Sequence, residues 1–231
     1  MSRKVAILQS NYIPWKGYFD IIRMVDEFVF YDDVQFTKND WRNRNRIKTA
    51  QGVQWISIPV KQISLDQKIC ETEIAFQNWA RKHWQTLVTN YSKARYFSYY
   101  RQVFEEFYLT TTDTLLSDIN HALVNLVNQQ LEIRTSIRRS TDFDLQGDKS
   151  ERLISLVKKL NGTIYVSGPS AKSYLNESMF REEGIDVHWM DYAGYPEYSQ
   201  LYPPFQHSVS ILDLLFNEGP ESIRYMKNPG P

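Results

Sequence analysis

The N-terminal part of the chain constrains the fold more than any other part. Residues 5–8 form a short apolar run of strand-forming side chains, and Pro14 and Gly17 mark a turn after it. Residues 18–25 then place apolar side chains at helical spacing, and residues 27–31 form a second apolar run. A strand, a helix and a strand within roughly thirty residues predict a βαβ unit, which implies a right-handed crossover and a parallel sheet.

A hairpin and a helical region are expected next. Residues 45–60 alternate in the manner of a hairpin with Gly52 in its turn, so we expect the sheet to be mixed. Residues 78–131 have a helical pattern in three pieces, which predicts a small helical subdomain. The pieces cover residues 79–91, 93–108 and 113–131.

The C-terminal part returns to alternating strands and helices. Asp148, with Glu151 three residues later, is a capping box that opens a helix. A further helix is expected at residues 168–183, and strands are expected at residues 134–140, 163–167 and 186–190. We therefore predict one α/β domain over residues 1–231, with a mainly parallel, Rossmann-related sheet flanked by helices.

Composition excludes several classes of protein. The 27 basic and 27 acidic side chains cancel, so no overall field points to DNA or to an anionic membrane. The one cysteine, Cys70, excludes an internal disulfide and thiolate metal clusters, and we expect it to be a small buried hydrophobe. No apolar run approaches the ~18 residues of a membrane span, and the apolar start is too short for a signal peptide. We expect a cytoplasmic protein without membrane insertion.

The turn after the first strand is unusually rich in amide and aromatic side chains. A strand-to-helix turn leaves N–H groups that favour phosphate or carboxylate, and Gly17 would permit close backbone approach. The alternative is a tight turn with aromatic side chains packed under it. The candidate ligand-binding residues are Gln9, Asn11, Tyr12, Trp15, Gly17 and Tyr18.

Two carboxylates, Asp32 and Asp33, end the second strand. Because parallel strands bring their carboxyl ends to one edge, we expect them beside the first turn. They could hold Mg²⁺, act as a base or bind sugar hydroxyls, and one of them could simply cap the next segment.

Residues 38–48 concentrate five positive charges against one acidic residue, Asp40. Arginine binds phosphate in bidentate fashion, so this segment suits a pyrophosphate or a nucleotide-sugar. A solvated hairpin face explains the charges as well, and an interleaved tryptophan would also suit single-stranded RNA. The candidate ligand-binding residues are Arg42, Asn43, Arg44 and Asn45, with Lys61 just after the hairpin.

The remaining candidates are isolated. His83 lies on a predicted helix and could act as a base near neutral pH, or could be a structural histidine. Ser167, Gly168 and Lys172 follow a predicted strand. No histidine pair has metal-ligand spacing, so we expect no metal centre built from histidines, and nucleophile-elbow, Walker and zinc-protease motifs do not occur.

The chain resembles the WbqC-like family, which is associated with bacterial O-antigen and other surface-polysaccharide gene clusters. The resemblance covers nearly all 231 residues and is carried by the motifs "QSNYIPWKGYFDII", "DDVQFTKNDWRNRNRIKT", "KHWQTLVTNYSKARYF", "YVSGPSAKSYL" and "SILDLLFNEG". Ser10 stands where we expect the family's proline. The resemblance implies sugar modification, with transfer of an aminoacyl or glycyl group to an amino-sugar.

A remoter resemblance is to the nucleotidylyltransferase and pantothenate-synthetase superfamily. Trp15, Gly17 and Tyr18 stand where that superfamily has its H-x-G-H turn, so the glycine is kept and both imidazoles are lost. Lys172 in "SGPSAK" would correspond to its late Ser/Lys loop. This resemblance implies ATP as a cofactor, but the missing histidines leave no obvious group to stabilise a phosphoryl transition state.

Two hypotheses follow. The first is an enzyme that joins an acyl or aminoacyl group to a nucleotide-linked amino-sugar, with Asp33 or His83, facing each other across a cleft, as the base. Its donor would be an adenylate, a carrier thioester or a charged tRNA. The second is a non-catalytic nucleotide-sugar-binding or RNA-binding module of a polysaccharide assembly complex.

Overall fold

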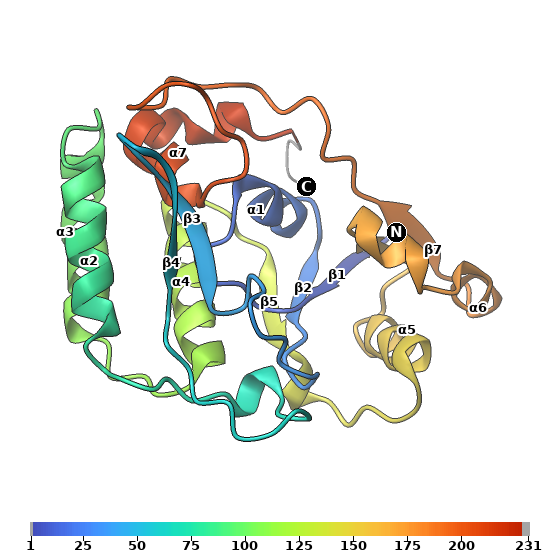
Figure 1. Cartoon of the computed structure of the whole chain (residues 1–231). Coiled ribbons are helices and arrows are strands. Elements are labelled where there is room, and N and C mark those ends of the chain that lie inside the picture. Colours follow the sequence, from blue (N-terminus) through green and yellow to red (C-terminus); the bar gives the residue numbers. More distant parts are fainter. Residues whose placement is uncertain (1, 228–231) are drawn as a thin grey trace.

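The computed structural model describes residues 2–227 and contains a central sheet of five parallel strands (Figure 1). The chain leaves β1 toward β2 and β5, then returns to add β6 and β7 on the other side of β1. The order β5-β2-β1-β6-β7 therefore reverses between β1 and β6, and ligands of open α/β sheets bind at such a switch point. The strands are β1 (Lys4–Leu8), β2 (Glu27–Phe30), β5 (Ser136–Arg139), β6 (Ile164–Ser167) and β7 (Asp186–Trp189).

Alternation along the strands divides the core into two layers. Ala6 and Phe28 pack with the apolar faces of α1 (Lys16–Arg23), α4 (Leu116–Gln130) and α7 (Ile211–Glu218). Their strand neighbours point to the opposite face of the sheet, where α5 (Lys149–Lys159) and α6 (Glu177–Glu182) provide the second apolar cluster. Burial on both faces explains why β1 and β2 are apolar runs.

Two further helices, α2 (Trp79–Tyr91) and α3 (Phe97–Thr110), pack against each other at one end of the molecule (Figure 1). Helices α2, α3 and α4 correspond to the three predicted helical pieces. Helix α3 begins four residues after the expected Lys93, and α4 begins three residues after the expected Asp113. Buried side chains of α2, α3 and α4 belong to the same hydrophobic cluster as β1 and β2. That residues 78–131 form a separate helical subdomain stays a prediction.

The hairpin forms, but it does not join the main sheet. Strands β3 (Arg44–Thr49) and β4 (Gly52–Ser57) make a separate antiparallel pair, and Gly52 follows the two-residue turn directly, at φ 110°. The expectation of a mixed sheet was therefore wrong. Asn45 attaches the hairpin to the first turn instead, because its Nδ2 donates to the carbonyl oxygens of Tyr12 and Ile13, at 2.9 Å each.

The C-terminal elements largely follow the sequence pattern. The capping box that opens α5 is confirmed, since the Asp148 carboxylate accepts hydrogen bonds from the N–H groups of Ser150 and Glu151. The helix expected at residues 168–183 is divided into a 3₁₀ turn (Pro169–Ser173) and α6, because Asn176 caps a new helix there. Further 3₁₀ turns cover Ile69–Glu71, Ser140–Asp142 and Gly219–Tyr225. No helix within residues 2–227 is long and apolar enough to span a membrane.

Candidate functional site at the carboxyl end of the sheet

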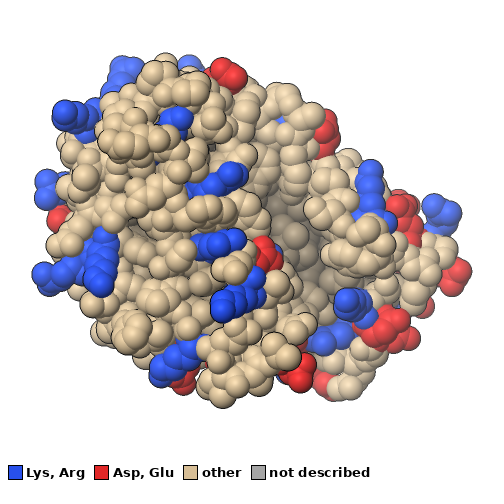
Figure 2. Space-filling model, in the orientation of Figure 1, with Lys and Arg blue, Asp and Glu red and all other residues tan. Residues whose placement is uncertain are grey.

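The main cleft has a volume of about 970 Å³ and lies at the switch point between β1 and β6. Figure 2 shows this face hollowed between the larger part of the molecule and the part that carries α5, α6 and β7. The cleft is formed by the segments that follow β1, β2 and β6 and by the first turn of α5. Its aromatic lining consists of Trp15, Tyr18, Tyr31, Tyr165, Tyr174 and Tyr192.

Two arginines supply positive charge to the cleft. Arg152, on the first turns of α5, forms an ion pair with Asp33, which also accepts a hydrogen bond from the Ser140 hydroxyl. Arg42, just before β3, donates to the side-chain oxygen of Asn11. Within the described chain, the Nε atoms of both arginines are buried without a hydrogen-bond partner. These Nε atoms are not accessible to a ligand, so the donors that can face the cleft are the terminal nitrogens. Arg42 also pairs with Asp40 at 3.4 Å, whereas Arg152 donates from Nη2 alone among residues 2–227.

Two backbone N–H groups of the first turn are hydrogen-bonded to other parts of the protein. The N–H of Ser10 donates to Asp32 Oδ1 at 2.8 Å, and the N–H of Tyr12 donates to the carbonyl oxygen of Trp41 at 3.1 Å. The expected anion cradle made of these N–H groups was therefore wrong. The cationic groups that line the cleft are instead the side chains of Arg42, Lys68, Lys149 and Arg152.

Gly17 makes room for Trp15 rather than for a ligand. Gly17 is buried and does not line the cleft, and a Cβ atom at this position would lie 2.3 Å from the Trp15 indole. The absence of a side chain lets the indole fold back over the start of α1 and form part of the cleft wall. Trp15 also packs edge-on against Tyr192, with ring centres 5.2 Å apart.

Gly17→Ala is expected to lower the free energy of unfolding by about 1–3 kcal/mol, the usual cost of overpacking. The gain in helix propensity of about 1 kcal/mol offsets only part of this cost. Urea denaturation measures the change. In a Trp15→Ala background the same glycine substitution should be neutral or stabilising, and an equal loss in both backgrounds would contradict the packing argument.

Asp32 and Asp33 point to different surroundings although they are adjacent. Asp33 lines the cleft, whereas Asp32 is buried and its Oδ2 lies 2.7 Å from Nε2 of His121 on α4. Asp32 therefore holds the first turn and α4 together and does not line the cleft, which corrects the expectation that it lies at the site. His121 was missed because a single histidine on an apolar helix face gives no signal in the sequence.

His83 lies in the core, away from the cleft. Its Nδ1 accepts from the Tyr12 hydroxyl at 2.7 Å, and its Nε2 donates to the carbonyl oxygen of Ser57 at 3.2 Å. Tyr12 is fully buried and also bonds Tyr108. The expected Asp33–His83 pair and the expected role of Tyr12 as a pocket wall were therefore wrong.

Burial lowers the pKa of His83 to about 4. An unfolded histidine titrates near pH 6.5, so the unfolded chain binds more protons below that pH and stability falls from about pH 6.5 to pH 4. We expect His83 to account for up to about 3 kcal/mol of this loss. His83→Gln, which cannot titrate, should flatten the dependence of unfolding free energy on pH in this window. An unchanged slope would contradict this assignment.

The basic segment contributes only Arg42 to the cleft. Asn43 donates to the carbonyl oxygen of Ile58, and Asn45 holds the first turn as described above. Arg44 lies over the ring of Trp55 on the outside of the hairpin, and Lys61 is paired with Glu73. These four side chains do not line the cleft, because alternation along β3 and the hairpin contacts direct them elsewhere.

Lys172 is also outside the cleft. It is exposed, and its Nζ lies 5.5 Å from the centre of the Trp189 ring. The expectation that Lys172 supplies a positive charge to the site was therefore wrong. Cys70 is half-buried rather than buried, and burial still raises the pKa of its thiol.

Several candidates do come together in the cleft. The cleft also contains Arg152, Tyr31, Tyr174 and Tyr192, which were missed because they are far apart in the sequence. Tyr174 lies within the motif "YVSGPSAKSYL", but nothing in that motif marks it as a cleft residue. The predicted residues that line it are Gln9, Asn11, Trp15, Tyr18, Asp33, Arg42, Ser167 and Gly168.

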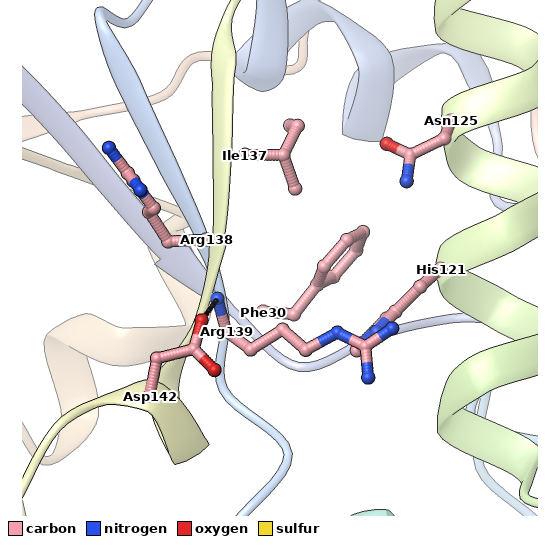
Figure 3. A pocket seen from close by; sticks show the side chains of 7 residues that line it. All are labelled: Phe30, His121, Asn125, Ile137, Arg138, Arg139 and Asp142. Atoms are coloured by element: carbon pink, nitrogen blue, oxygen red, sulfur yellow. Dashed lines mark hydrogen bonds between the residues drawn. The ribbon is translucent and has the colours of Figure 1, made fainter.

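A second, smaller cavity of about 410 Å³ lies between β5 and α4 (Figure 3). Phe30, His121, Asn125 and Ile137 line it together with Arg139, whose guanidinium is already paired with Asp118. In the described chain no group of three or more His, Cys, Asp or Glu side chains is arranged to hold a metal ion.

Comparisons with known proteins show the family of the chain. The model of the WbqC-like protein family matches residues 9–225, and the chain belongs to this family. The chain is 50% identical, over 226 residues, to the protein named "Uncharacterized protein Rv1507c" of Mycobacterium tuberculosis (strain ATCC 25618 / H37Rv). The match covers 97% of this chain and 98% of that protein. No solved structure matches.

Proposed function

We propose that this chain is a transferase of surface-polysaccharide (O-antigen) biosynthesis that binds a nucleotide-linked amino-sugar in the main cleft and adds an acyl or aminoacyl group, such as glycyl, to the sugar's amine. One observation carries the proposal: two arginines, Arg42 and Arg152, lie beside aromatic walls at the switch point of a parallel sheet. Arginines suit a diphosphate, and flat rings suit a nucleobase or a sugar face. Nucleotide-linked amino-sugars for polysaccharide assembly would reach the cleft from the cytoplasm.

The diphosphate would bind between Arg42 and Arg152, next to the end of β6. Ser167 and Gly168 lie at that end, and a Cβ atom on Gly168 would come within 3.5 Å of the Tyr192 hydroxyl. Any Mg²⁺ that accompanies the substrate would take most of its ligands from the phosphates and from water, as this ion usually does.

Asp33 would act as the general base in this reaction. The amine must be neutral to attack an acyl carbon. When a phosphate engages Arg152, Asp33 loses its ion-pair partner and can accept the proton that leaves nitrogen. The N–C bond then forms as the bond between the acyl carbon and its carrier breaks, and the carrier leaves.

The donor would arrive already activated. ATP-dependent activation in this cleft would have to proceed without Lys172 and without the two histidines of the H-x-G-H turn. We therefore favour a carrier-borne or tRNA-borne acyl group over an adenylate formed in place. Exchange of labelled pyrophosphate into ATP in the presence of glycine or other carboxylic acids would contradict this preference.

Calorimetric titration with UDP- and dTDP-amino-sugars tests the binding site. Arg152→Gln should weaken binding by about 10- to 100-fold, the scale of losing a charged hydrogen bond. Arg101→Gln is the matched control, because Arg101 is an exposed helical arginine paired with Glu105 far from the cleft lining. Equal affinity in both variants, with unchanged unfolding temperatures, would rule out the site.

A non-catalytic binding module remains the second candidate function. The observation in its favour is that no histidine is found among the described residues that line the cleft, while Asp33 is held in an ion pair. Such a module would bind nucleotide-sugars with the same dependence on Arg152 and would not turn them over.

A further inference from the structure

The outer face of the hairpin carries two tryptophans and two arginines, which we call the hairpin patch: Trp41, Arg44, Arg46 and Trp55. The guanidinium of Arg44 lies 4.3 Å from the Trp55 ring centre, and that of Arg46 lies 5.4 Å and 5.5 Å from the centres of Trp41 and Trp55. The two indoles are 5.1 Å apart. Trp41 is 37% exposed and Trp55 42% exposed, so both keep open ring surface.

The positive charge of the hairpin patch is not compensated. In residues 2–227, neither Arg44 nor Arg46 forms an ion pair with a carboxylate, whereas exposed arginines elsewhere, such as Arg101 and Arg139, do. The Nε atoms of Arg44 and Arg46 are also buried without a hydrogen-bond partner in this part of the chain. The Arg44 guanidinium also donates to the carbonyl oxygen of Asn39, so the hairpin patch offers a ligand uncompensated positive charge beside exposed aromatic faces.

The hairpin patch is fixed next to the main cleft. The carbonyl oxygen of Trp41 accepts the N–H of Tyr12, and Asn45 bonds the same turn. Arg42, one residue after Trp41, lines the cleft. Figure 2 shows basic side chains on this face beside the hollow. An extended ligand bound on the hairpin patch can thus continue directly into the cleft.

We propose that the hairpin patch binds the single-stranded end of an RNA that carries the transferred acyl group. Single-stranded nucleic acids bind where bases stack on aromatic rings and phosphates meet basic side chains, and the stacking tolerates any base. The neutral charge of the whole chain agrees with a short contact of a few nucleotides rather than a long duplex footprint. The RNA identity rests on the proposed transfer reaction, since the cleft beside the patch needs an acyl donor.

Fluorescence anisotropy with a labelled single-stranded RNA of about 12 nucleotides tests the patch directly. Wild type should bind, and Trp41→Ala and Trp55→Ala should each weaken binding by about 5- to 100-fold. Tyr99→Ala, which removes an aromatic residue on α3 that is 67% exposed, should bind like wild type. Arg44→Gln and Arg46→Gln should each reduce the slope of log affinity against log salt by about 0.7.

The possible outcomes separate this proposal from the proposed function. A wild type that fails to bind the RNA, or equal loss in Trp55→Ala and Tyr99→Ala, overturns the RNA site whatever the nucleotide-sugar titration shows. Tighter binding of an acidic polysaccharide or of single-stranded DNA of the same length also overturns it. Loss of RNA binding in Trp55→Ala with unchanged nucleotide-sugar affinity supports it and shows that the two sites are distinct.

Discussion

Asp33→Asn is expected to lower the single-turnover rate of acyl or aminoacyl transfer by about 10²-fold or more, the usual scale for losing a general base. Asparagine can still accept the hydrogen bond from Ser140, so the fold should be preserved. It no longer competes with the diphosphate for Arg152, so affinity for the nucleotide-sugar should be unchanged or higher. Mass spectrometry of the amino-sugar with candidate donors measures the rate, beside calorimetry and thermal unfolding.

The combination of a slower reaction with intact binding is what separates the enzyme from the binding module. Asp118→Asn, a surface carboxylate paired with Arg139, is the matched control and should react at the wild-type rate. If wild type turns over no amino-sugar with any donor, or if Asp33→Asn keeps the wild-type rate, Asp33 is not the base. Binding without turnover would then favour the module.

Asp32→Ala is expected to cost about 3–5 kcal/mol of unfolding free energy, which is typical of breaking a buried pair by removing one partner. The substitution leaves the N–H of Ser10 and the Nε2 of His121 without their acceptor in a buried site. Because Ser10 belongs to the first turn, the cleft wall should loosen as well. Urea denaturation measures the loss.

The neighbouring surface pair provides the comparison for this prediction. Asp118→Ala removes an exposed partner of Arg139 and should cost less than about 1 kcal/mol. In a His121→Phe background, Asp32→Ala should cost markedly less than in wild type, since the pair is already broken. Equal costs in the two backgrounds would show that Asp32 acts through the Ser10 N–H alone.

The local pattern of the sequence determined the secondary structure and the edge of the sheet at which the cleft lies. Apolar runs at residues 5–8 and 27–31 with helical spacing between them require a parallel pair, and parallel strands place their carboxyl ends together. The residues following these strands, such as Gln9, Asn11 and Asp33, therefore could be found in advance. The capping box at Asp148 was equally readable, because both of its partners lie within one helical turn.

Tertiary structure decided which side chains face the cleft and which belong to the core. Asp32 and Asp33 have the same local signal, and only the packing of α4 and α5 buries the one against His121 and turns the other toward Arg152. His83 and Tyr12 were expected at the site and instead form a hydrogen bond in the core. The reason is that His83 on α2 contacts both the hairpin, at Ser57, and the first turn, at Tyr12. Long-range contacts of this kind depend on the relative placement of whole elements, and no residue spacing along the chain encodes them.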